Sequence, residues 1–133
     1  MKIGFTGTIS GMSPAQRDKF TALLMELGAS QLHHGDCVGS DADAHGIARS
    51  LDIEVVLHPP SNDRSRAFCR GSVEERPPRA YLARNKRIVD ATEVLIATPW
   101  GPEQRRSGTW ATIRYARKRA RTCYIVMRDG ALL

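Results

Sequence analysis

Cysteine is scarce in this chain of 133 residues, which has three cysteines and no C-x-x-C spacing. An odd number of isolated thiols argues against a disulfide framework or a cysteine-rich zinc knuckle as the basis of the fold. Long apolar runs are missing too, because no stretch reaches the roughly 20 residues that span a bilayer, and the first residues enter a strand pattern without a signal-peptide core. We therefore expect a cytoplasmic protein with reduced thiols and no membrane partner.

Two familiar phosphate-binding motifs are also absent. The chain has neither the G-x-G-x-x-G turn of dinucleotide-binding Rossmann domains nor the G-x-x-x-x-G-K-[ST] sequence of P-loop proteins. Aromatic residues make up only 6% of the chain, and they form no interleaved stacking surface of the kind that single-strand-binding proteins use. These absences disfavour the familiar NAD dehydrogenases and P-loop ATPases, and they count against a single-strand binder.

The composition that remains is that of one folded domain, with 41% hydrophobic and 26% charged residues. The length allows a single core, so residues 1–133 are treated as one domain. The net charge of +6 is uneven, since residues 1–60 carry −3 and residues 61–133 carry +9. A basic half of this kind attracts anions, which favours a phosphate-bearing partner; a solvated helix face is the alternative interpretation.

Strand-like and helical segments alternate along the chain. The expected strands are 3–6, 31–34, 54–57, 94–98 and 123–127, and the expected helices are 14–27, 42–51, 81–90 and 108–120. Strands separated by such helices pair in parallel through right-handed crossovers. The pattern predicts an α/β fold, a Rossmann-like three-layer sandwich with a mostly parallel five-stranded sheet. Residues 61–78, which are polar and rich in arginine, are expected to form a long mobile loop.

Glycine-rich turns follow three of the expected strands, at residues 7–11, 35–41 and 99–109. In a parallel sheet these turns meet beyond the carboxyl ends of the strands, where ligands bind. Small residues let an anion approach backbone N–H groups, and the positive end of the following helix favours negative charge. A single turn of this kind needs glycine for its own geometry. Three turns at one edge favour a site for a phosphate-bearing ligand.

Two of the turns contain capping residues. Asp41 and His45 lie one helical turn apart, and Asp41 is expected to be the N-cap of the second helix. Ser107 is expected to cap the last helix, which leaves the N–H groups of Gly108 and Thr109 free to face a ligand.

The third expected helix contributes Arg84 and Asn85. Arg84 shares a face with Ile88, so we expect it to point inward, where it would contact a phosphate or form a structural ion pair. Asn85 would contact the ligand or brace the backbone. Trp110 is expected in the core, whereas Trp100 would stack on a base. A metal cluster is the weaker interpretation of His33, His34, Asp36, Asp41 and His45, and no metal is expected.

Two segments together resemble a known family. The run Gly35-Asp36-Cys37-Val38-Gly39-Ser40-Asp41-Ala42-Asp43-Ala44-His45, followed by Ser107-Gly108-Thr109-Trp110-Ala111-Thr112, resembles the SLOG superfamily, which includes DNA-processing protein A and the Lonely Guy phosphoribohydrolases. Within it, the sequence is most similar to the YpsA-related single-domain branch, over nearly the whole chain. The resemblance implies a Rossmann-like homo-oligomer that binds nucleotides or nucleotide-derived signals, and no further cofactor is expected. The expected ligand-binding residues are Gly7, Thr8, Gly35, Asp36, Gly39, Asp41, Arg84, Asn85, Ser107, Gly108, Thr109 and Thr112.

The hydrolases of that superfamily carry M-x-x-R-K and G-G-x-G-T-x-x-E, and the resemblance assigns their Arg and Glu to cleavage of an N-glycosidic bond. The segment 82–86 is similar to the first motif and supplies Arg84, but Thr112 occupies the position of the Glu. A hydroxyl cannot replace a carboxylate as a base or stabilise an oxocarbenium ion by charge. Asp36, Asp41 or Glu103 would have to take that role, and Arg84 with Asp36 are the catalytic candidates.

The leading hypothesis is a domain that binds a small phosphorylated nucleoside and acts as a sensor or a sequestering protein. Hydrolysis of the N-glycosidic bond of a nucleoside monophosphate is left open. The alternative is a single-stranded nucleic-acid-binding protein like the DNA-processing relative, because the second half of the chain is so basic. A further idea is a lid over the bound anion, formed by Arg64, Arg66, Arg70, Arg76 and Arg79.

Overall fold

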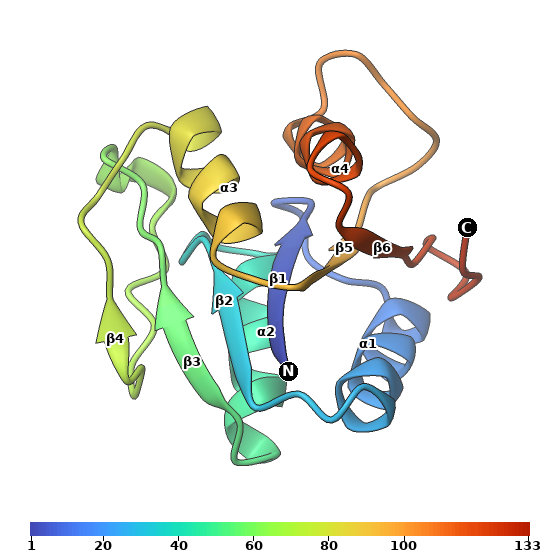
Figure 1. The fold of residues 1–133 in the computed structure, drawn as a ribbon, viewed down its shortest axis with the longest axis horizontal. Helices are drawn as coiled ribbons and strands as arrows, with labels where there is room; N and C mark the ends of the chain where they lie inside the picture. Colours follow the sequence, from blue (N-terminus) through green and yellow to red (C-terminus); the bar gives the residue numbers. More distant parts are fainter.

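Six parallel strands form one sheet in the computed structural model, which describes residues 1–133 (Figure 1). The strands are β1 Lys2–Gly7, β2 Gln31–His34, β3 Glu54–Leu57, β4 Glu74–Glu75, β5 Val94–Thr98 and β6 Thr122–Ile125. Their order across the sheet is β4-β3-β2-β1-β5-β6, and every neighbouring pair is parallel. The α/β, Rossmann-like prediction is confirmed, with six strands in place of the expected five.

The additional strand, β4, lies within the segment that was expected to be a mobile loop. It contains two glutamates and no apolar residue, so its sequence carries no strand pattern. The segment also contains a short 3₁₀ turn, Asp63–Ser65. Backbone hydrogen bonds to β3 hold the segment, with Val73 donating to the Val55 carbonyl at 2.9 Å and Arg76 donating to the Leu57 carbonyl at 2.8 Å. These contacts between distant residues are not visible in the sequence.

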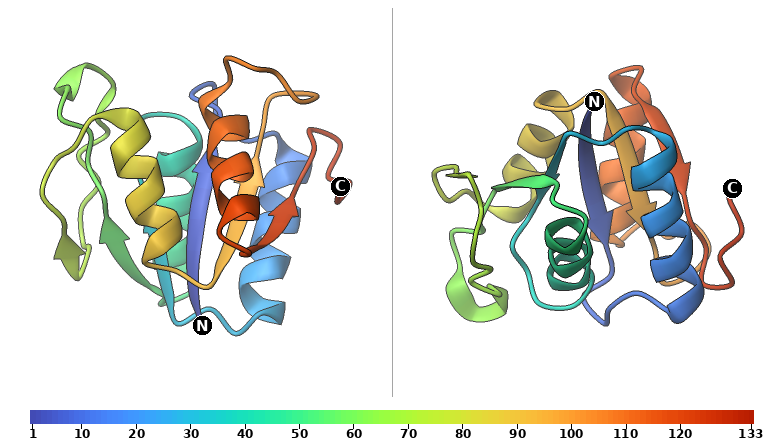
Figure 2. Two further views of the ribbon diagram at one scale, coloured as in Figure 1. Left: turned by 45° about the horizontal axis from the view of Figure 1, so that its top comes forward. Right: turned by 90° about the horizontal axis from the view of Figure 1, so that it is seen from below.

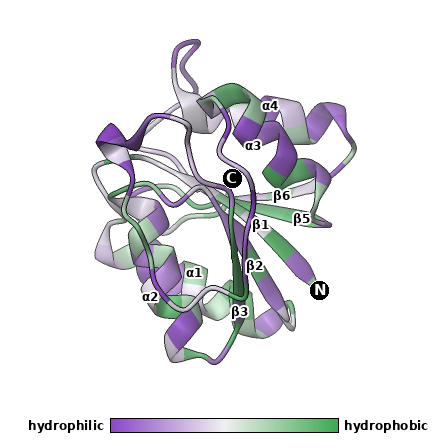
Figure 3. Ribbon diagram, turned by 90° about the vertical axis from the view of Figure 1, so that its left-hand side faces the viewer, coloured by the Kyte–Doolittle hydropathy of each residue, from purple (hydrophilic) through white to green (hydrophobic).

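Helices cover both faces of the sheet (Figure 2). Helices α1 Pro14–Glu26 and α2 Ser40–Ser50 lie on one face, and α3 Tyr81–Asp90 and α4 Gly108–Lys118 lie on the other. Strand β5 shows how the faces alternate, because Ile96 packs with α1 and α2 while Leu95 and Ala97 pack with α3 and α4. In Figure 3 β5 is largely hydrophobic, whereas α3 and α4 carry hydrophilic residues on their outer surfaces. The three-layer sandwich is therefore confirmed, and no helix is both long and apolar enough to span a membrane.

Helix α1 begins with a capping box that also fixes the ends of two strands. The Ser13 side chain accepts from the Gln16 N–H at 3.0 Å, and the Gln16 side chain accepts from the Ser13 N–H at 2.9 Å. Gln16 is fully buried, and its amide nitrogen donates to the carbonyls of Pro99 and Val126 at 3.0 and 2.9 Å. The first turn of α1 thereby positions the chain just beyond β5 and β6.

Helix α2 begins two residues earlier than expected, and the prediction that Asp41 is its N-cap is wrong. The N-cap is Gly39, whose φ of +89° and lack of a Cβ bring it against the Ile9 backbone. The Ser40 N–H and hydroxyl both donate to the Thr8 carbonyl, at 3.2 and 2.5 Å. The start of α2 is therefore fixed against the turn that follows β1.

The direction of the crossovers reverses between β1 and β5. The chain moves outward from β1 through β2 and β3 to β4, and then returns to place β5 on the other side of β1. Gly7 and Thr98, the last residues of β1 and β5, lie opposite each other in the register. In open α/β sheets the crevice outside such a reversal binds ligands. The fold thus places the expected turns around one crevice.

Candidate functional site

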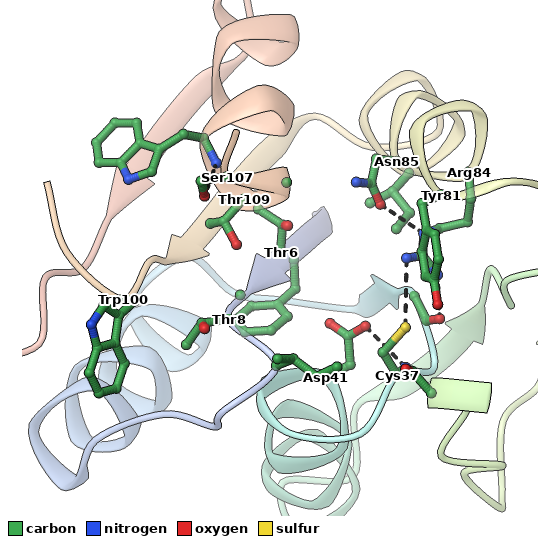
Figure 4. A pocket seen from close by; sticks show the side chains of 18 of the residues that line it. Thr6, Thr8, Cys37, Asp41, Tyr81, Arg84, Asn85, Trp100, Ser107 and Thr109 are labelled. Atoms are coloured by element: carbon green, nitrogen blue, oxygen red, sulfur yellow. Dashed lines mark hydrogen bonds between the residues drawn. The ribbon is translucent and has the colours of Figure 1, made fainter. Parts of the chain in front are cut away.

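A cavity of about 440 Å³ opens at the carboxyl ends of β1 and β5 (Figure 4). Its wall comes from the end of β1, the turns that follow β1 and β2, helix α3, the segment after β5 and the first turn of α4. The volume falls within the range of about 300 to 1,000 Å³ that is typical of small-molecule sites. Elements distant in the sequence therefore form one pocket at the edge where the glycine-rich turns are expected to meet.

Most of the expected ligand-binding residues lie in the cavity wall. Those that line it are Gly7, Thr8, Gly35, Asp41, Arg84, Asn85, Ser107, Gly108 and Thr109. Asp36, Gly39 and Thr112 do not line it. Gly39 instead lies against the backbone of Ile9, where the turns after β1 and β2 meet. The Thr112 hydroxyl donates to the Gly108 carbonyl of its own helix at 2.9 Å. These two residues support the wall without forming it.

The first turn of α4 presents unused backbone donors. Ser107 is the N-cap as expected, and its side chain accepts from the Trp110 N–H at 3.2 Å. The N–H groups of Gly108 and Thr109 have no hydrogen-bond partner in the protein. Trp110 is in the core, as expected, and its indole donates to the Gly101 carbonyl at 3.0 Å. A helix start with free donors in a cavity is a suitable place for an anion.

Arg84 is buried in the wall without a carboxylate partner. Only 6% of the residue is exposed, and it forms no ion pair. Its Nη1 donates to the carbonyls of Gly35 and His58, at 2.5 and 3.0 Å, and its Nε donates to the Asn85 side chain at 2.7 Å. Asn85 thus braces a side chain as well as lining the cavity. A fixed guanidinium whose charge lacks an acidic partner favours an anionic ligand.

Asp41 supplies a carboxyl group to the same wall. It accepts from the Cys37 N–H at 3.2 Å. Burial raises the pKa of Asp41 from 3.8 to about 6, although Arg84 acts in the opposite direction. Of the three carboxyls that the sequence offered as substitutes for the missing Glu, this is the one that lines the cavity. The site therefore contains a carboxyl that exchanges its proton near neutral pH.

Asp36 lies outside the wall and holds the segment 61–78. Asp36 is fully buried, and its backbone φ is +54°. One carboxylate oxygen accepts from Arg66 Nε at 2.8 Å, and the other accepts from the Cys69 N–H at 2.8 Å. Arg66 also pairs with Glu75 at 3.1 Å. These contacts engage both carboxylate oxygens, so Asp36 positions the segment 61–78.

Exposed aromatic side chains lie on two sides of the cavity mouth. Trp100 is on one side, and Tyr81 lies beside Arg84 on the other (Figure 4). Trp100 is 61% exposed and Tyr81 is 42% exposed. The Arg128 guanidinium lies 4.4 Å from the centroid of the Trp100 ring. Sequence reasoning singled out Trp100 but missed Tyr81, because a tyrosine on a helix gives no sign of whether it faces a pocket.

The histidines are a second candidate cluster, and the ring nitrogens of His34 and His45 lie within 4.8 Å of each other and of Cys69 Sγ. His34 Nδ1 accepts from the Asp36 N–H at 2.9 Å, so its proton is on Nε2, which donates to His45 Nδ1 at 3.0 Å. His45 Nε2 then donates to the Arg70 carbonyl at 2.6 Å. A metal would need the lone pair of His34 Nε2. The donor set therefore fits a hydrogen-bond chain better than a metal site.

Known proteins relate to this chain through structure and not through sequence. No protein-family model matches the sequence, and no curated protein matches it. The molybdenum cofactor binding protein of the phototrophic bacterium Rippkaea orientalis aligns with a TM-score of 0.73 and 21% identity, over 96% of this chain and 77% of that one. DNA processing protein A of Streptococcus pneumoniae aligns with a TM-score of 0.66 and 16% identity, over 93% of this chain and 49% of that one. The chain has the fold of these proteins.

A third similar structure, the protein designated TM1055, aligns with a TM-score of 0.68 and 17% identity, over 98% of this chain and 75% of that one. Identities at this level establish the fold alone. DNA-processing protein A belongs to the superfamily that the glycine-rich segments resemble, so the fold implied by the SLOG resemblance is confirmed.

Proposed function

We propose that this protein binds a small phosphorylated nucleoside in the cavity and acts as a sensor or a sequestering protein. The observation that carries the proposal is the buried guanidinium of Arg84, which forms no ion pair, in a wall that also contains the free N–H groups of Gly108 and Thr109. Both features favour a negatively charged ligand. The exposed rings of Trp100 and Tyr81 would provide apolar surfaces for a flat base.

The similar structures agree with this class of ligand. The Rippkaea protein is described as binding the molybdenum cofactor, and the pneumococcal protein as processing DNA.

Calorimetric titration with nucleoside mono- and diphosphates, ADP-ribose and NAD tests the proposal. We expect one member to bind with a 1:1 stoichiometry. Arg84→Gln should weaken that binding by about 10- to 100-fold, because hydrogen bonds to charged groups contribute roughly 1.5 to 3 kcal/mol. Arg117→Gln, which removes an exposed charge at the far end of α4, is the matched control and should change affinity less than about twofold. No binding across the panel would contradict the proposal.

Hydrolysis of the N-glycosidic bond is a second candidate, favoured by the raised pKa of Asp41 in the wall. In that case AMP or a related monophosphate would yield free base and ribose 5-phosphate, which chromatography detects. Asp41→Asn keeps an oxygen that accepts from the Cys37 N–H but removes the ionisable group. Loss of product with retained binding would support catalysis by Asp41. If no free base appears after prolonged incubation with the unaltered protein, hydrolysis is contradicted and only the binding proposal stands.

Single-stranded nucleic acid remains the alternative ligand, because residues 61–133 carry a charge of +9. Binding through phosphates would weaken steeply with salt. A gel-shift titration at about 50 and 200 mM salt, where such affinities commonly change by several orders of magnitude, separates the two cases. A pocket for a small ligand should not retard DNA at the higher salt, whereas retardation that weakens steeply between the two salts and is still measurable at the higher one would favour the alternative.

A further inference from the structure

Arg84 also lines a second, smaller cavity of about 60 Å³, which we call the arginine pocket. Its lining residues are His58, Arg76, Pro77, Arg79, Arg84 and Arg87, and none of them is hydrophobic. They come from three parts of the chain: the residue after β3, the segment after β4, and helix α3. The two cavities share Arg84 as a wall, and the arginine pocket has no role in the nucleoside site proposed above.

Positive charge in the arginine pocket exceeds negative charge. Arg76 forms an ion pair with Glu74, but Arg79, Arg84 and Arg87 form none. The backbone around Arg79 is fixed, because its N–H donates to the Pro59 carbonyl at 3.2 Å and its carbonyl accepts from the Ser61 N–H at 2.8 Å. Cations gathered in this way repel one another, and a bound anion would relieve that repulsion.

His58 adds a hydrogen-bond acceptor to this group of donors. Gln31 Nε2 donates to the Glu54 carboxylate at 3.4 Å, so its Oε1 accepts from His33 Nε2 at 2.7 Å. His33 Nδ1 is then unprotonated and accepts from His58 Nε2 at 2.9 Å. His58 is only 3% exposed, and its Nδ1 is left with a lone pair and no partner in the protein.

An oxyanion that keeps one proton can bind both the arginine donors and the His58 acceptor of the arginine pocket. Its unprotonated oxygens accept from the guanidinium groups, and its O–H donates to His58 Nδ1. The volume of about 60 Å³ exceeds the roughly 10 to 15 Å³ that a single water molecule needs, so the pocket admits a group larger than one water. Sulfate has the same shape and is fully deprotonated at neutral pH, so it cannot donate to His58.

We propose that the arginine pocket is a second binding site, for a phosphate group that carries one proton, either as inorganic phosphate or as the end of a phosphomonoester. Arg79 and Arg87 bind its oxygens from the exposed side, and Arg84 binds from the wall shared with the larger cavity. His58 selects phosphate over sulfate.

Titration of the uniformly ¹⁵N-labelled protein with inorganic phosphate, observed by NMR at the histidine ring nitrogens and at the backbone amides, tests this site. The ring nitrogens of His58 should shift, whereas sulfate should bind at least about fivefold more weakly, because it has no proton to donate to His58 Nδ1. Glycerol 3-phosphate distinguishes the sources: a shift of His58 shows that the pocket accepts monoesters, and no shift restricts it to the free ion. Shifts of the Gly108 and Thr109 amides alone would place phosphate in the larger cavity and overturn the proposal.

A pair of charge-matched variants completes the test. Arg79→Gln with Arg87→Gln removes two exposed side chains that form no ion pair, and phosphate affinity at His58 should fall at least about tenfold. Arg117→Gln with Lys118→Gln removes the same charge from the end of α4 and should change affinity less than about twofold. Equal losses in the two double variants, or sulfate binding as tight as phosphate, would overturn the site. Because the ligand is inorganic phosphate and the reporter is His58, failure here is distinguishable from failure of the nucleoside proposal.

Discussion

Acid should unfold this protein steeply, because three buried histidines, His33, His34 and His58, have a lowered pKa. Burial is the main cause of each shift: it lowers the pKa of His33 from 6.5 to about 4, that of His58 from 6.5 to about 3, and that of His34 well below 6.5. In the unfolded chain these imidazoles regain a pKa near 6.5. Below that pH the unfolded chain takes up protons that the folded chain does not, so the free energy of unfolding falls as the pH falls.

The slope near pH 5 can be worked out from these groups. Each proton held only by the unfolded chain changes the free energy of unfolding by about 1.4 kcal/mol per pH unit, and three histidines contribute one proton each. Asp41 opposes them, because its pKa of about 6 lets the folded chain hold a proton that the unfolded chain has lost above 3.8. The net difference of about two protons gives roughly 2.7 kcal/mol per pH unit. For a domain of about 5 to 15 kcal/mol, a fall of one or two pH units is a large part of the total.

Urea unfolding followed by circular dichroism at half-unit steps from pH 7 to pH 4.5 measures this slope. The double variant His33→Gln with His58→Gln removes two of the three uptake sites, so its slope near pH 5 should approach zero. The comparison uses slopes, so any loss of stability common to all pH values does not affect it. A free energy of unfolding that is constant between pH 6.5 and 5, or a slope unchanged in the double variant, would refute the assignment of neutral buried histidines.

Three further predictions concern the framework of the site. Gly39→Ala should lower the free energy of unfolding by more than about 2 kcal/mol, because its Cβ would clash with the Ile9 backbone at a residue whose φ is positive. Gly46→Ala, which adds a Cβ in open space on α2, should raise the free energy of unfolding by about 0.5 to 1 kcal/mol. Urea titration of both variants checks this pair of predictions. Gln16→Ala should cost about 2 to 5 kcal/mol in the same assay, since it leaves two buried carbonyls and the N-cap N–H unpaired. Asp36→Asn should release the segment 61–78, so limited proteolysis should cut there first, and cleavage elsewhere would contradict its positioning role.

Local patterns in the sequence were sufficient for the elements and for the edge of the sheet that holds the cavity. The N-cap at Ser107 is a contact within a few residues, and that prediction is confirmed. The prediction that Asp41 caps α2 was wrong because the position of the N-cap, Gly39, is set by close contact with the backbone of Ile9, which is distant in the sequence. Strand β4 was missed for the same kind of reason, since two glutamates form a strand only because β3 lies beside them.

In the candidate site too, features set by local spacing could be predicted, whereas features set by contacts between distant segments could not. Glycine-rich turns and the position of Arg84 on a helix face can be inferred from spacing, and the structure brings them together in one wall. The commitment of Asp36 to Arg66 depends on how the segment 61–78 returns to the β2–α2 turn, and spacing carries no information on that path. The arginine pocket likewise arises from three separate segments. The homo-oligomer and the cytoplasmic location stay predictions.

A crystal structure of the protein grown with the best-binding nucleotide would show directly whether the cavity holds the ligand. We expect phosphate oxygens about 3 Å from the amide nitrogens of Gly108 and Thr109, a base against Trp100 or Tyr81, and Arg84 directed at the anion. Electron density for the nucleotide on another surface, with those two amides bonded only to water, would contradict it.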